Sequence, residues 1–489
     1  MAIGAALGTV EDFWIGGGPS PASGAGRIRL INPATEEALG TVPEASAADV
    51  GAAVDAANSA LRDPAWRDLG AADRASLLRR LADGLDKRAD EMAPLITRQN
   101  GMPVKMVRWG NVGGAAFSYR WFADLAESTP VEELRPSPRS RTLVSNDPVG
   151  VVGIIAPWNG PQILVAWKLG PALAAGCTAV LKPAPETSLD ARLLAEAVAE
   201  AGFPPGVFNV VTGGPETGAA LVEHAGVDKV AFTGSTAAGR DIAARCGAAL
   251  KPVSLELGGK SAALLLDDVD TAAFGKQVTR LCAPNSGQVC YSCTRILAPR
   301  SRYDEVVETV VEEMRGARMG DPLAEETSFG PLVSARQRGR VEEYIAVGAA
   351  EGAELVLGGG RPADLERGWF VEPTVFRHVD NGMRVAREEI FGPVLVVIPY
   401  DGEEEGIAIA NDSEYGLGGA VFTADPERGL AAARRIESGT VGINGYEPVL
   451  EAPFGGVKAS GLGRELGPEG FAAYREPKSI YNAPDTADV

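Results

Sequence analysis

A regular alternation of apolar segments with helical segments, between residues 149 and 257, constrains the fold of this 489-residue chain more than any other feature. Each apolar segment is short and continuous, and the segment after it has helical spacing. Continuous apolar strands are typical of a parallel sheet with both faces covered, and the alternation favours an α/β domain. The predicted strands are residues 149–155, 178–181, 207–211, 229–233 and 253–257. We therefore predict a doubly wound domain of the nucleotide-binding type.

A second α/β series begins after residue 259. Its predicted strands are residues 262–266 and 295–298, its predicted helices are residues 271–282 and 303–315, and further units continue to about residue 442. Ahead of both series, short strands are predicted at residues 13–15 and 28–31, and apolar residues recur at helical spacing between residues 47 and 127, with Asp73 as an N-cap. The chain exceeds the size of a single core, so we expect two or three domains.

Two segments are expected to lie outside these domains. Residues 130–148 are rich in Pro, Ser and Arg and predict an extended arm. Residues 478–481 predict a late strand that pairs with the arm near Leu143.

Charge and hydropathy exclude several classes of partner. A formal net charge of −19 repels nucleic acid and anionic lipid, and no apolar run approaches the roughly 20 residues that span a bilayer. We therefore expect a small-molecule partner, with no nucleic acid and no membrane. The N-terminus has no basic segment followed by an apolar one, so we expect no signal peptide and a cytoplasmic location.

The cysteines and histidines limit the chemistry further. Five cysteines in a chain of this length do not form a disulfide framework, which favours a reducing compartment. Cys290 and Cys293 form a C-x-x-C pair, but there is no second pair, so we predict no metal site. Neither of the two histidines lies in a motif, so any general base is expected to be a carboxylate.

Three short stretches carry the candidate chemistry. Cys290 follows a Gly-Gln turn that can lift its thiol out of the surrounding apolar sequence. Glu256 offers a carboxylate at a strand end, and the Gly234-Ser235 turn, with Gly239 further on, follows one strand and opens a helix whose N–H groups suit a phosphate. Because the thiol and the carboxylate belong to different α/β units, we expect the site in the cleft between them. Together they indicate a nucleotide-using acyl chemistry.

Motifs along nearly the whole chain resemble those of the aldehyde dehydrogenase superfamily. In order they are Pro157-Trp158-Asn159, Lys182-Pro183-Ala184, residues 232–239, residues 256–260, Asn285-x-Gly287-Gln288-x-Cys290, residues 388–393 and the glycine-rich stretch 453–461. The resemblance implies a Rossmann-like parallel-sheet cofactor domain (1–125 and 149–258), a second α/β catalytic domain (259–459), and a small β arm for oligomerisation and bridging (126–148 and 460–489). It also implies a homodimer or homotetramer.

The resemblance implies that Cys290 is the catalytic nucleophile. Only a thiolate attacks, so we expect positive charge or hydrogen bonds to lower the thiol pKa below its free value of about 8.5. Attack on an aldehyde gives a thiohemiacetal oxyanion, for which the Asn159 side-chain amide and the Cys290 backbone N–H are the implied donors. Loss of one such donor typically lowers the rate about 10²- to 10³-fold.

Glu256 resembles the base that activates water against the resulting thioester. Its apolar neighbours are expected to raise its pKa toward neutrality. CoA-acylating relatives lack a glutamate here, so Glu256 favours release of a free acid. A CoA-acylating enzyme, and a catalytically silent scaffold or binding protein of this fold, stay as alternatives.

The implied cofactor is NAD, with NADP left open. A carboxylate near the 2′-OH disfavours NADP, but the position three residues after Lys182 is Pro185, with Glu186 one further on. The residues implied to contact the cofactor are Trp158, Lys182, Gly234, Ser235, Gly239, Glu389 and Phe391.

The expected substrate is an aldehyde that is hydrophobic or aromatic, because no Lys or Arg lies among the expected pocket residues. These residues are Gly160, Leu164, Trp167, Val289, Tyr291 and the loop from Glu447 to Phe454. Gly160 stands where many relatives have a bulky aromatic side chain, which predicts a wider tunnel. Cys293 is interpreted as structural, or as a partner that traps oxidised Cys290 in a disulfide.

Overall fold

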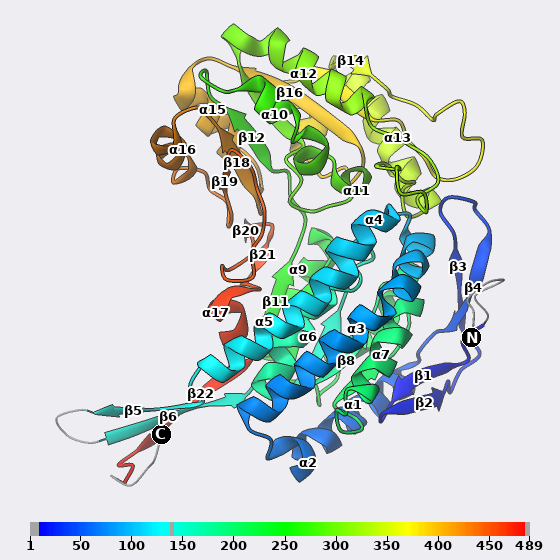
Figure 1. Ribbon diagram of the computed structural model, residues 1–489, viewed down its shortest axis with the longest axis vertical. Coiled ribbons are helices and arrows are strands. Elements are labelled where there is room, and N and C mark those ends of the chain that lie inside the picture. The colour runs from blue at the N-terminus through cyan, green and yellow to red at the C-terminus, as the bar shows by residue number, and fades with distance from the viewer. Residues whose placement is uncertain (1–8, 137–140, 485–489) are drawn as a thin grey trace.

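The structure, a computed structural model, describes residues 9–136 and 141–484. Two α/β lobes lie one above the other, and a β arm projects from the lower lobe (Figure 1). This arrangement confirms the predicted α/β fold class with two parallel-sheet lobes and an arm. The domain boundaries themselves stay a prediction.

The first lobe is built on an eight-stranded sheet whose central strands are parallel. In spatial order they are β2 (Gly18–Pro21), β1 (Asp12–Ile15), β9 (Phe208–Val210), β8 (Thr178–Lys182), β7 (Val151–Ile155), β10 (Lys229–Thr233), β11 (Val253–Glu256) and β21 (Gly461–Leu462). Successive residues of β7, such as Ile154 and Ile155, enter separate apolar clusters on the two faces of the sheet. Burial on both faces explains the continuous apolar runs of the sequence.

Helices cover both faces of this sheet. They are α1 (Ala47–Arg62), α2 (Pro64–Arg67), α3 (Ala71–Asn100), α4 (Val104–Met106), the π-helix η1 (Val107–Gly113), α5 (Gly114–Ser128), α6 (Ile163–Ala175), η2 (Pro185–Thr187), α7 (Leu189–Glu200), α8 (Pro215–Glu223), α9 (Thr236–Ala248) and α17 (Gly467–Ala472). A hairpin of β3 (Arg27–Ile31) and β4 (Ala38–Pro43) lies beside them.

The second lobe has a seven-stranded sheet. Its order is β14 (Glu354–Leu357), β15 (Thr374–Arg377), β16 (Val394–Tyr400), β13 (Arg295–Pro299), β12 (Ala262–Leu265), β18 (Gly419–Phe422) and β19 (Gly442–Ile443). Its helices are α10 (Thr271–Gly275), η3 (Val278–Cys282), α11 (Pro284–Gly287), η4 (Arg300–Arg302), α12 (Tyr303–Arg315), α13 (Ala335–Ala350), α14 (Arg384–Arg387), α15 (Gly402–Asn411) and α16 (Pro426–Ala433). A small pair, β17 (Tyr415–Gly416) and β20 (Val457–Lys458), completes it.

The arm consists of β5 (Glu132–Pro136), β6 (Arg141–Pro148) and β22 (Arg475–Tyr481). Antiparallel pairing places Ile480 opposite Leu143, which confirms the expected contact between the late strand and the arm. Residues 137–140, which follow β5 and precede β6 in the sequence, lie outside the described residues.

Three local expectations were wrong. The helix predicted at 271–282 is broken into α10 and η3, with a turn at residues 276–277 between them. Gly70, not Asp73, is the N-cap of α3, and the Asp73 carboxylate accepts the Gly70 N–H from the third helical position. The sequence also predicts that Asp190 stands at the start of the helix after Leu189, but Asp190 does not cap α7: its carboxylate is buried and accepts from the Gln99 and Gln162 side chains.

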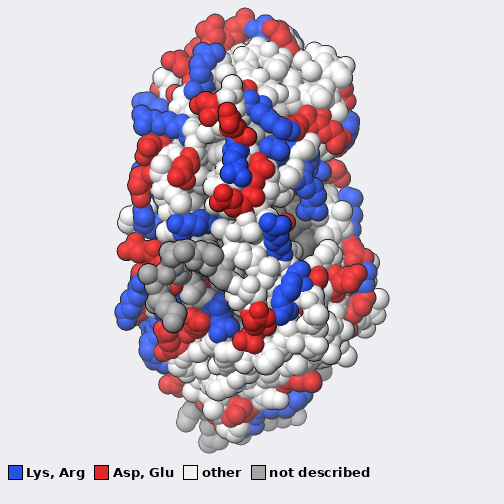
Figure 2. Space-filling view, turned by 90° about the vertical axis from the view of Figure 1, so that its right-hand side faces the viewer, with Lys and Arg blue, Asp and Glu red and all other residues white. Residues whose placement is uncertain are grey.

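Surface charge is distributed, not concentrated. Acidic and basic side chains are intermixed over the face shown in Figure 2, consistent with ion pairs such as Arg435 with Glu404 and Arg361 with Glu342. Within residues 9–136 and 141–484, no helix has the length and apolar character needed to cross a membrane.

Candidate active site

Three adjacent parallel strands of the first lobe bring several candidate residues to one edge. Strand β10 lies between β7 and β11, so their carboxyl ends meet. Asn159 follows β7, Gly234 follows β10, and Glu256 is the last residue of β11. Ligands of doubly wound sheets bind outside this carboxyl edge.

Cys290 reaches the same edge from the second lobe, on a strained turn. Asn285, Ser286 and Gly287 have φ angles of 50°, 55° and 76°, in the left-handed region that is unfavourable for most side chains. Gly287 is required, because a Cβ there would lie 2.0 Å from the Gly392 carbonyl oxygen. The Ser286 hydroxyl donates to the Gly330 carbonyl at 2.8 Å and fastens the turn. Strain of this kind persists where the surroundings determine it, often at functional sites.

Two cavities meet at the thiol. One has a volume of about 590 Å³ and opens along α13, and the other has a volume of about 650 Å³ and runs between α5, α6 and the 447–454 loop. Cys290, Asn159 and Thr233 line both cavities. A molecule in each cavity would therefore meet the other at Cys290.

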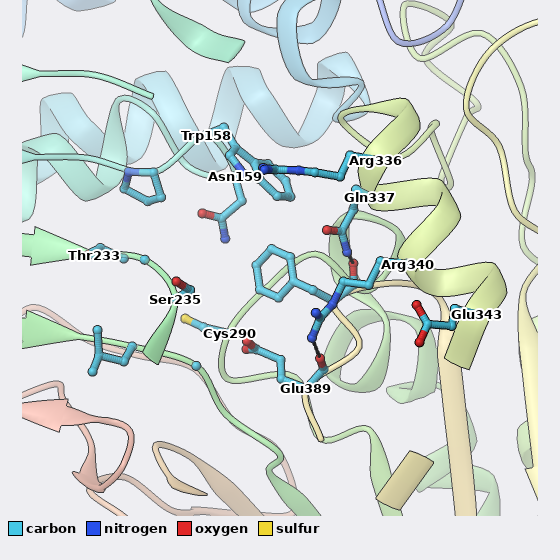
Figure 3. Close-up of a pocket in the computed structure, with 15 residues that line it drawn as sticks. Trp158, Asn159, Thr233, Ser235, Cys290, Arg336, Gln337, Arg340, Glu343 and Glu389 are labelled. Atoms are coloured by element: carbon cyan, nitrogen blue, oxygen red, sulfur yellow. Dashed lines mark hydrogen bonds between the residues drawn. The ribbon is translucent and has the colours of Figure 1, made fainter. Parts of the chain in front are cut away.

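The amide of Asn159 is held beside Cys290. Its nitrogen donates to the Gln288 carbonyl at 3.0 Å, and Figure 3 shows this nitrogen pointing into the pocket on the side of Cys290. An amide has two N–H donors, so one is left for an oxygen in the cavity. The Asn100 amide donates to the Trp158 carbonyl at 3.1 Å and holds the loop from behind.

Glu256 is 3% exposed, and its Oε2 accepts no hydrogen bond from a described residue. Burial and then the neighbouring Glu465 raise its pKa well above the ordinary value, while Lys168 acts in the opposite direction. The direction agrees with the sequence-based expectation for this carboxyl. Gly455 leaves room for it, because a Cβ there would lie 2.6 Å from Glu256 Oε1.

The sequence analysis missed the buried ion pair beside Glu256. Lys168 Nζ lies 2.6 Å from Glu465 Oε1 and donates to the Thr233 hydroxyl at 2.5 Å. One cue was available for the lysine, since it is the only charged residue of the apolar helix α6. No comparable pattern marked Glu465.

The expectation that the site lowers the Cys290 pKa was wrong. Burial, followed by the charges of Glu389 and Glu256, raises the pKa of this thiol to about 12. The backbone N–H groups of Cys290 and Tyr291 act in the opposite direction but are outweighed. The sulfur is therefore protonated at neutral pH in this arrangement.

Replacing Glu389 with Gln should speed alkylation of Cys290 by iodoacetamide about three- to tenfold, since one pKa unit changes the thiolate fraction tenfold. Burial raises the pKa of Glu389 to about 7, so the carboxylate is charged at mildly alkaline pH and the amide is not. A glutamine still accepts the Gly259 N–H, now bonded to Glu389 Oε1 at 3.0 Å. The measurement is the alkylation rate by mass spectrometry.

Glu388→Gln is the matched control for that experiment. Glu388 is the preceding residue, but its carboxylate pairs with Arg384 at 2.9 Å and accepts from Tyr344. Its loss should leave alkylation unchanged. Equal rates for Glu389→Gln and the unchanged chain would show that Glu389 does not govern the thiol.

The predicted cofactor residues divide into two groups. Trp158, Gly234, Ser235, Glu389 and Phe391 line the 590 Å³ cavity, and the Trp158 and Phe391 rings meet edge to face with centroids 5.4 Å apart. Lys182 and Gly239 do not line this cavity.

Each of these two residues has a different environment. Burial lowers the pKa of Lys182 to about 8 while Glu186 raises it, and its ammonium donates to the Pro183 and Gly213 carbonyls at 2.9 and 3.0 Å. A carboxylate therefore lies near the end of β8, as the NAD interpretation requires. A Cβ at Gly239 would lie 2.4 Å from Leu257, so this glycine allows close packing of α9 on the strand end.

Helix α13 contributes three residues that sequence reasoning missed, although a cluster of arginines at 336–340 was visible. Arg336, Gln337 and Arg340 line the 590 Å³ cavity. Arg340 donates to the Glu389 carbonyl at 2.6 Å and Gln337 to the Phe391 carbonyl at 2.8 Å. Figure 3 shows the Arg336 side chain reaching over the cavity toward Trp158.

These residues fit a dinucleotide. The N-terminus of the 13-residue helix α9 opens at Ser235, and α13 adds guanidinium groups, both of which suit a pyrophosphate. A Cβ at Gly258 would lie 2.5 Å from Glu389 Oε2. The absence of a side chain at Gly258 therefore makes room for the Glu389 carboxylate beside the thiol. A carboxylate in such a position suits a ribose hydroxyl.

The five predicted substrate-pocket residues outside the 447–454 loop, and Phe454 within it, line the 650 Å³ cavity. The Trp167 and Phe454 ring centroids lie 5.4 Å apart, and those of Tyr291 and Phe454 lie 6.3 Å apart. Val449 and Leu450 of the expected 447–454 loop also line it, and further apolar lining residues, not singled out from the sequence, are Met102, Met106, Phe117 and Ile163. No described Lys or Arg lines this cavity.

Comparison with known proteins gives consistent matches along the chain. The model of the "Aldehyde dehydrogenase family" matches residues 21–480. A geranial dehydrogenase of Castellaniella defragrans is 53% identical over 456 residues, covering 93% of this chain and 95% of that protein. A chloroplastic aminoaldehyde dehydrogenase of Arabidopsis thaliana is 41% identical, covering 93% and 92%. The crystal structure of a Mycobacterium tuberculosis aldehyde dehydrogenase complexed with NAD+ has a TM-score of 0.96 at 46% identity, covering 99% and 100%.

Proposed function

The chain belongs to the aldehyde dehydrogenase family, and on this premise we propose that it uses NAD+ to oxidise a hydrophobic or aromatic aldehyde to the free carboxylic acid. One observation supports this most directly: the two cavities meet at Cys290, with Asn159 on both and Glu256 on the apolar one. A thiol, an amide donor and a carboxylate base around one point are the groups that thioester chemistry needs.

In the first step the Cys290 sulfur bonds to the aldehyde carbon, and the carbonyl electron pair moves to the oxygen. The free N–H of Asn159 and the backbone N–H of Cys290 hold this oxyanion. Because the thiol is protonated at rest, its proton has to leave during attack. Solvent water takes this proton, so the Glu256 carboxylate stays free for the second half of the reaction. When bound, NAD+ supplies the hydride acceptor that converts the thiohemiacetal into a thioester.

Glu256 then serves as the base of hydrolysis. Its carboxylate takes a proton from water as the water oxygen attacks the thioester carbon, and the bond from that carbon to the Cys290 sulfur breaks. The acid leaves and the thiol is restored. A buried carboxyl with a raised pKa is matched to this work near neutral pH.

The cofactor preference follows from charge. Glu186 lies near Lys182 at the end of β8, where a carboxylate would repel the additional phosphate of NADP. The similar Mycobacterium tuberculosis structure contains NAD+. We therefore propose NAD+ as the preferred cofactor.

The arm is proposed to join copies of the chain into a homodimer or homotetramer. The arm sheet has the strand order β22-β6-β5, so β22 and β5 are its outer strands. Each of them has one edge that pairs with no strand of the described residues. Val131, Ile480 and Tyr481 are 45%, 44% and 71% exposed on this arm. Exposed strand edges with apolar side chains are natural pairing surfaces.

The test of this function is a panel of aldehydes with NAD+ or NADP+, without CoA. We expect benzaldehyde and decanal to give free acid with NAD+, and kcat/KM at least about tenfold higher than for an ω-aminoaldehyde, because an apolar cavity leaves an ammonium group unsolvated. The charged competitor is a stringent comparison, since Glu447 and Glu451 line the cavity and one relative is named for aminoaldehydes. A requirement for CoA, or a preference for NADP+ or the aminoaldehyde, would contradict the proposal.

A further inference from the structure

A group of buried polar side chains lies behind the loop that carries Trp158 and Asn159. Gln99, Gln162 and Asp190 are each 1% exposed. They come from the end of α3, the start of α6 and the start of α7, and none of the three lines either cavity. Burying polar groups is unfavourable unless hydrogen bonds satisfy them, so the partners of these side chains indicate what the group holds together.

The Asp190 carboxylate joins the two glutamines. Its Oδ1 accepts from Gln99 Nε2 at 2.9 Å, and its Oδ2 accepts from Gln162 Nε2 at 2.6 Å. Burial raises the pKa of Asp190 to about 6, while the hydrogen bonds from Gln162 and Gln99 lower it, so this carboxyl is ionised at neutral pH. Because a carboxylate only accepts hydrogen bonds, it orients both amides with their nitrogen toward Asp190.

The two amides differ in their remaining contacts. Gln99 Oε1 also accepts the Leu189 N–H at 2.9 Å, so this amide is fixed at both ends. Gln162 Oε1 accepts from no described residue. Among the described residues, the orientation of the Gln162 amide therefore depends on Asp190 alone.

The loop between β7 and α6 is held on both sides of Asn159. On one side Asn100, the last residue of α3, donates to the Trp158 carbonyl at 3.1 Å. On the other side Asn111 Oδ1 accepts the backbone N–H of Gln162 at 2.9 Å, and the Gln162 side chain adds the contact with the carboxylate. Asn159 therefore lies between two attachment points.

The direction of the Asn159 amide depends on this loop. The one hydrogen bond described for its side chain goes to the Gln288 carbonyl at 3.0 Å, from the nitrogen that also has to serve an oxyanion. Hydrogen bonds weaken steeply when donor and acceptor are misaligned, and oxyanion donors act because they are oriented before the reaction. A small displacement of the loop would therefore weaken the contact of Asn159 with the oxyanion.

We propose that Asp190 and Gln162 are positioning residues for aldehyde oxidation: their hydrogen bond fixes the loop so that the Asn159 amide meets the oxyanion formed at Cys290. This inference rests on the proposed function, because it takes the oxyanion to form at that sulfur. Neither residue lines a cavity, so both act through Asn159.

The first test is Gln162→Asn, which shortens the side chain by one methylene group and takes its amide out of reach of Asp190. The backbone contact with Asn111 is kept. We expect kcat and kcat/KM for decanal to fall together by about tenfold, because the affected contact is made only in the transition state. Gln162→Met, which keeps the length and removes the amide, should give the same loss and serves if Gln162→Asn does not fold.

A compensating change tests the pair directly. Gln162→Asn combined with Asp190→Glu moves one methylene group from one side chain to the other and restores the combined length. We expect kcat to recover to within about threefold of the unchanged chain. Asp190→Glu alone should show no such recovery.

A double-mutant cycle distinguishes positioning of Asn159 from general support of the fold. Asn159→Ala should lower kcat by about 10²- to 10³-fold, the usual effect of losing an oxyanion donor. In this background Gln162→Asn should lower kcat by no more than about a further twofold, because no amide is left to position. A further tenfold loss, or an unchanged kcat for Gln162→Asn alone, would overturn the proposal.

Thr178→Val is the matched control. Thr178 on β8 is fully buried, and its hydroxyl donates to the Ala57 carbonyl at 3.0 Å. The change removes one buried hydrogen bond of the same lobe away from the loop. It should lower the midpoint of thermal unfolding and leave kcat within about twofold of normal.

Hydrogen exchange separates this inference from the proposed function. In Gln162→Asn the amides of residues 158–163 should exchange at least about tenfold faster, whereas in Thr178→Val they should not, as measured by mass spectrometry of the peptides. If the unchanged chain oxidises no aldehyde but this difference is found, the function fails and the attachment of the loop stands. Equal exchange in the two variants would show that the Asp190 contact does not hold the loop.

Discussion

Replacing Cys290 with Ser should lower the rate of aldehyde oxidation by at least about 10⁴-fold, the scale on which loss of a catalytic nucleophile acts. A serine hydroxyl loses its proton far less readily than a thiol, and burial together with Glu389 and Glu256 already raises the pKa of the thiol to about 12. Burial and these two carboxylates would oppose formation of a serine alkoxide more strongly than formation of a cysteine thiolate. The measurement is the initial rate of reduced-cofactor formation, with NAD+ binding determined in parallel and expected to be unchanged.

Cys293→Ala is the matched control for this variant. Cys293 is the other thiol of the C-x-x-C pair, is fully buried, and lines neither cavity. It acts as a small apolar core residue, so its replacement should retain activity within about threefold. Activity within tenfold of normal for Cys290→Ser, or equal inactivation by both changes, would contradict the assignment of Cys290.

Replacing Glu256 with Gln should separate the two halves of the reaction. We expect a burst of about one equivalent of reduced cofactor per active site, followed by a steady-state rate about 10²- to 10⁴-fold below normal, the usual contribution of a general base. The amide cannot take a proton from water, so the thioester accumulates on Cys290. Rapid-mixing kinetics measures the burst, and mass spectrometry of the quenched protein identifies the acyl group on Cys290.

Glu451→Gln controls for a general loss of negative charge near the substrate. Glu451 lines the apolar cavity but is exposed on its loop, and its replacement should leave the burst and the steady-state rate close to normal. An absent burst in Glu256→Gln would place Glu256 in the attack step, as acceptor of the thiol proton. A normal steady-state rate would exclude it as the base.

The two replacements have opposite signatures. Cys290→Ser removes the burst together with turnover, whereas Glu256→Gln removes turnover and keeps the burst. A catalytically silent scaffold would show neither in any form of the protein. A CoA-acylating enzyme would show turnover only when CoA is present.

Much of the fold was predictable because local pattern encodes local structure. Strand β10 was predicted at its observed bounds, and α12 likewise, since continuous apolar runs and helical spacing report directly on burial. The antiparallel pairing of β22 with β6 was also anticipated. The break between α10 and η3 was not, because the apolar spacing of residues 271–282 continues through it.

The candidate site was predictable to the extent that its residues lie in short motifs. The order of these motifs made Cys290, Asn159 and Glu256 candidates before any coordinates, and the parallel order of β7, β10 and β11 brings the latter two to one sheet edge. Lys168 and Glu465 escaped notice because they come together across 297 positions of sequence and neither stands in a motif used above. The arginines of α13 were visible as a basic cluster, but nothing in the sequence placed them over the cofactor cavity.

The sequence by itself determined the α/β class, the order of the strands along the chain and the choice of candidate reactive groups, because each of these depends on neighbouring residues. Only the tertiary structure decided the charge state of those groups and the shape of the space around them. The pKa of the Cys290 thiol is raised by burial and by two carboxylates from distant segments, and the apolar cavity is lined by residues of α5, α6 and the 447–454 loop. Both depend on distances between residues far apart in the chain, which no local pattern records.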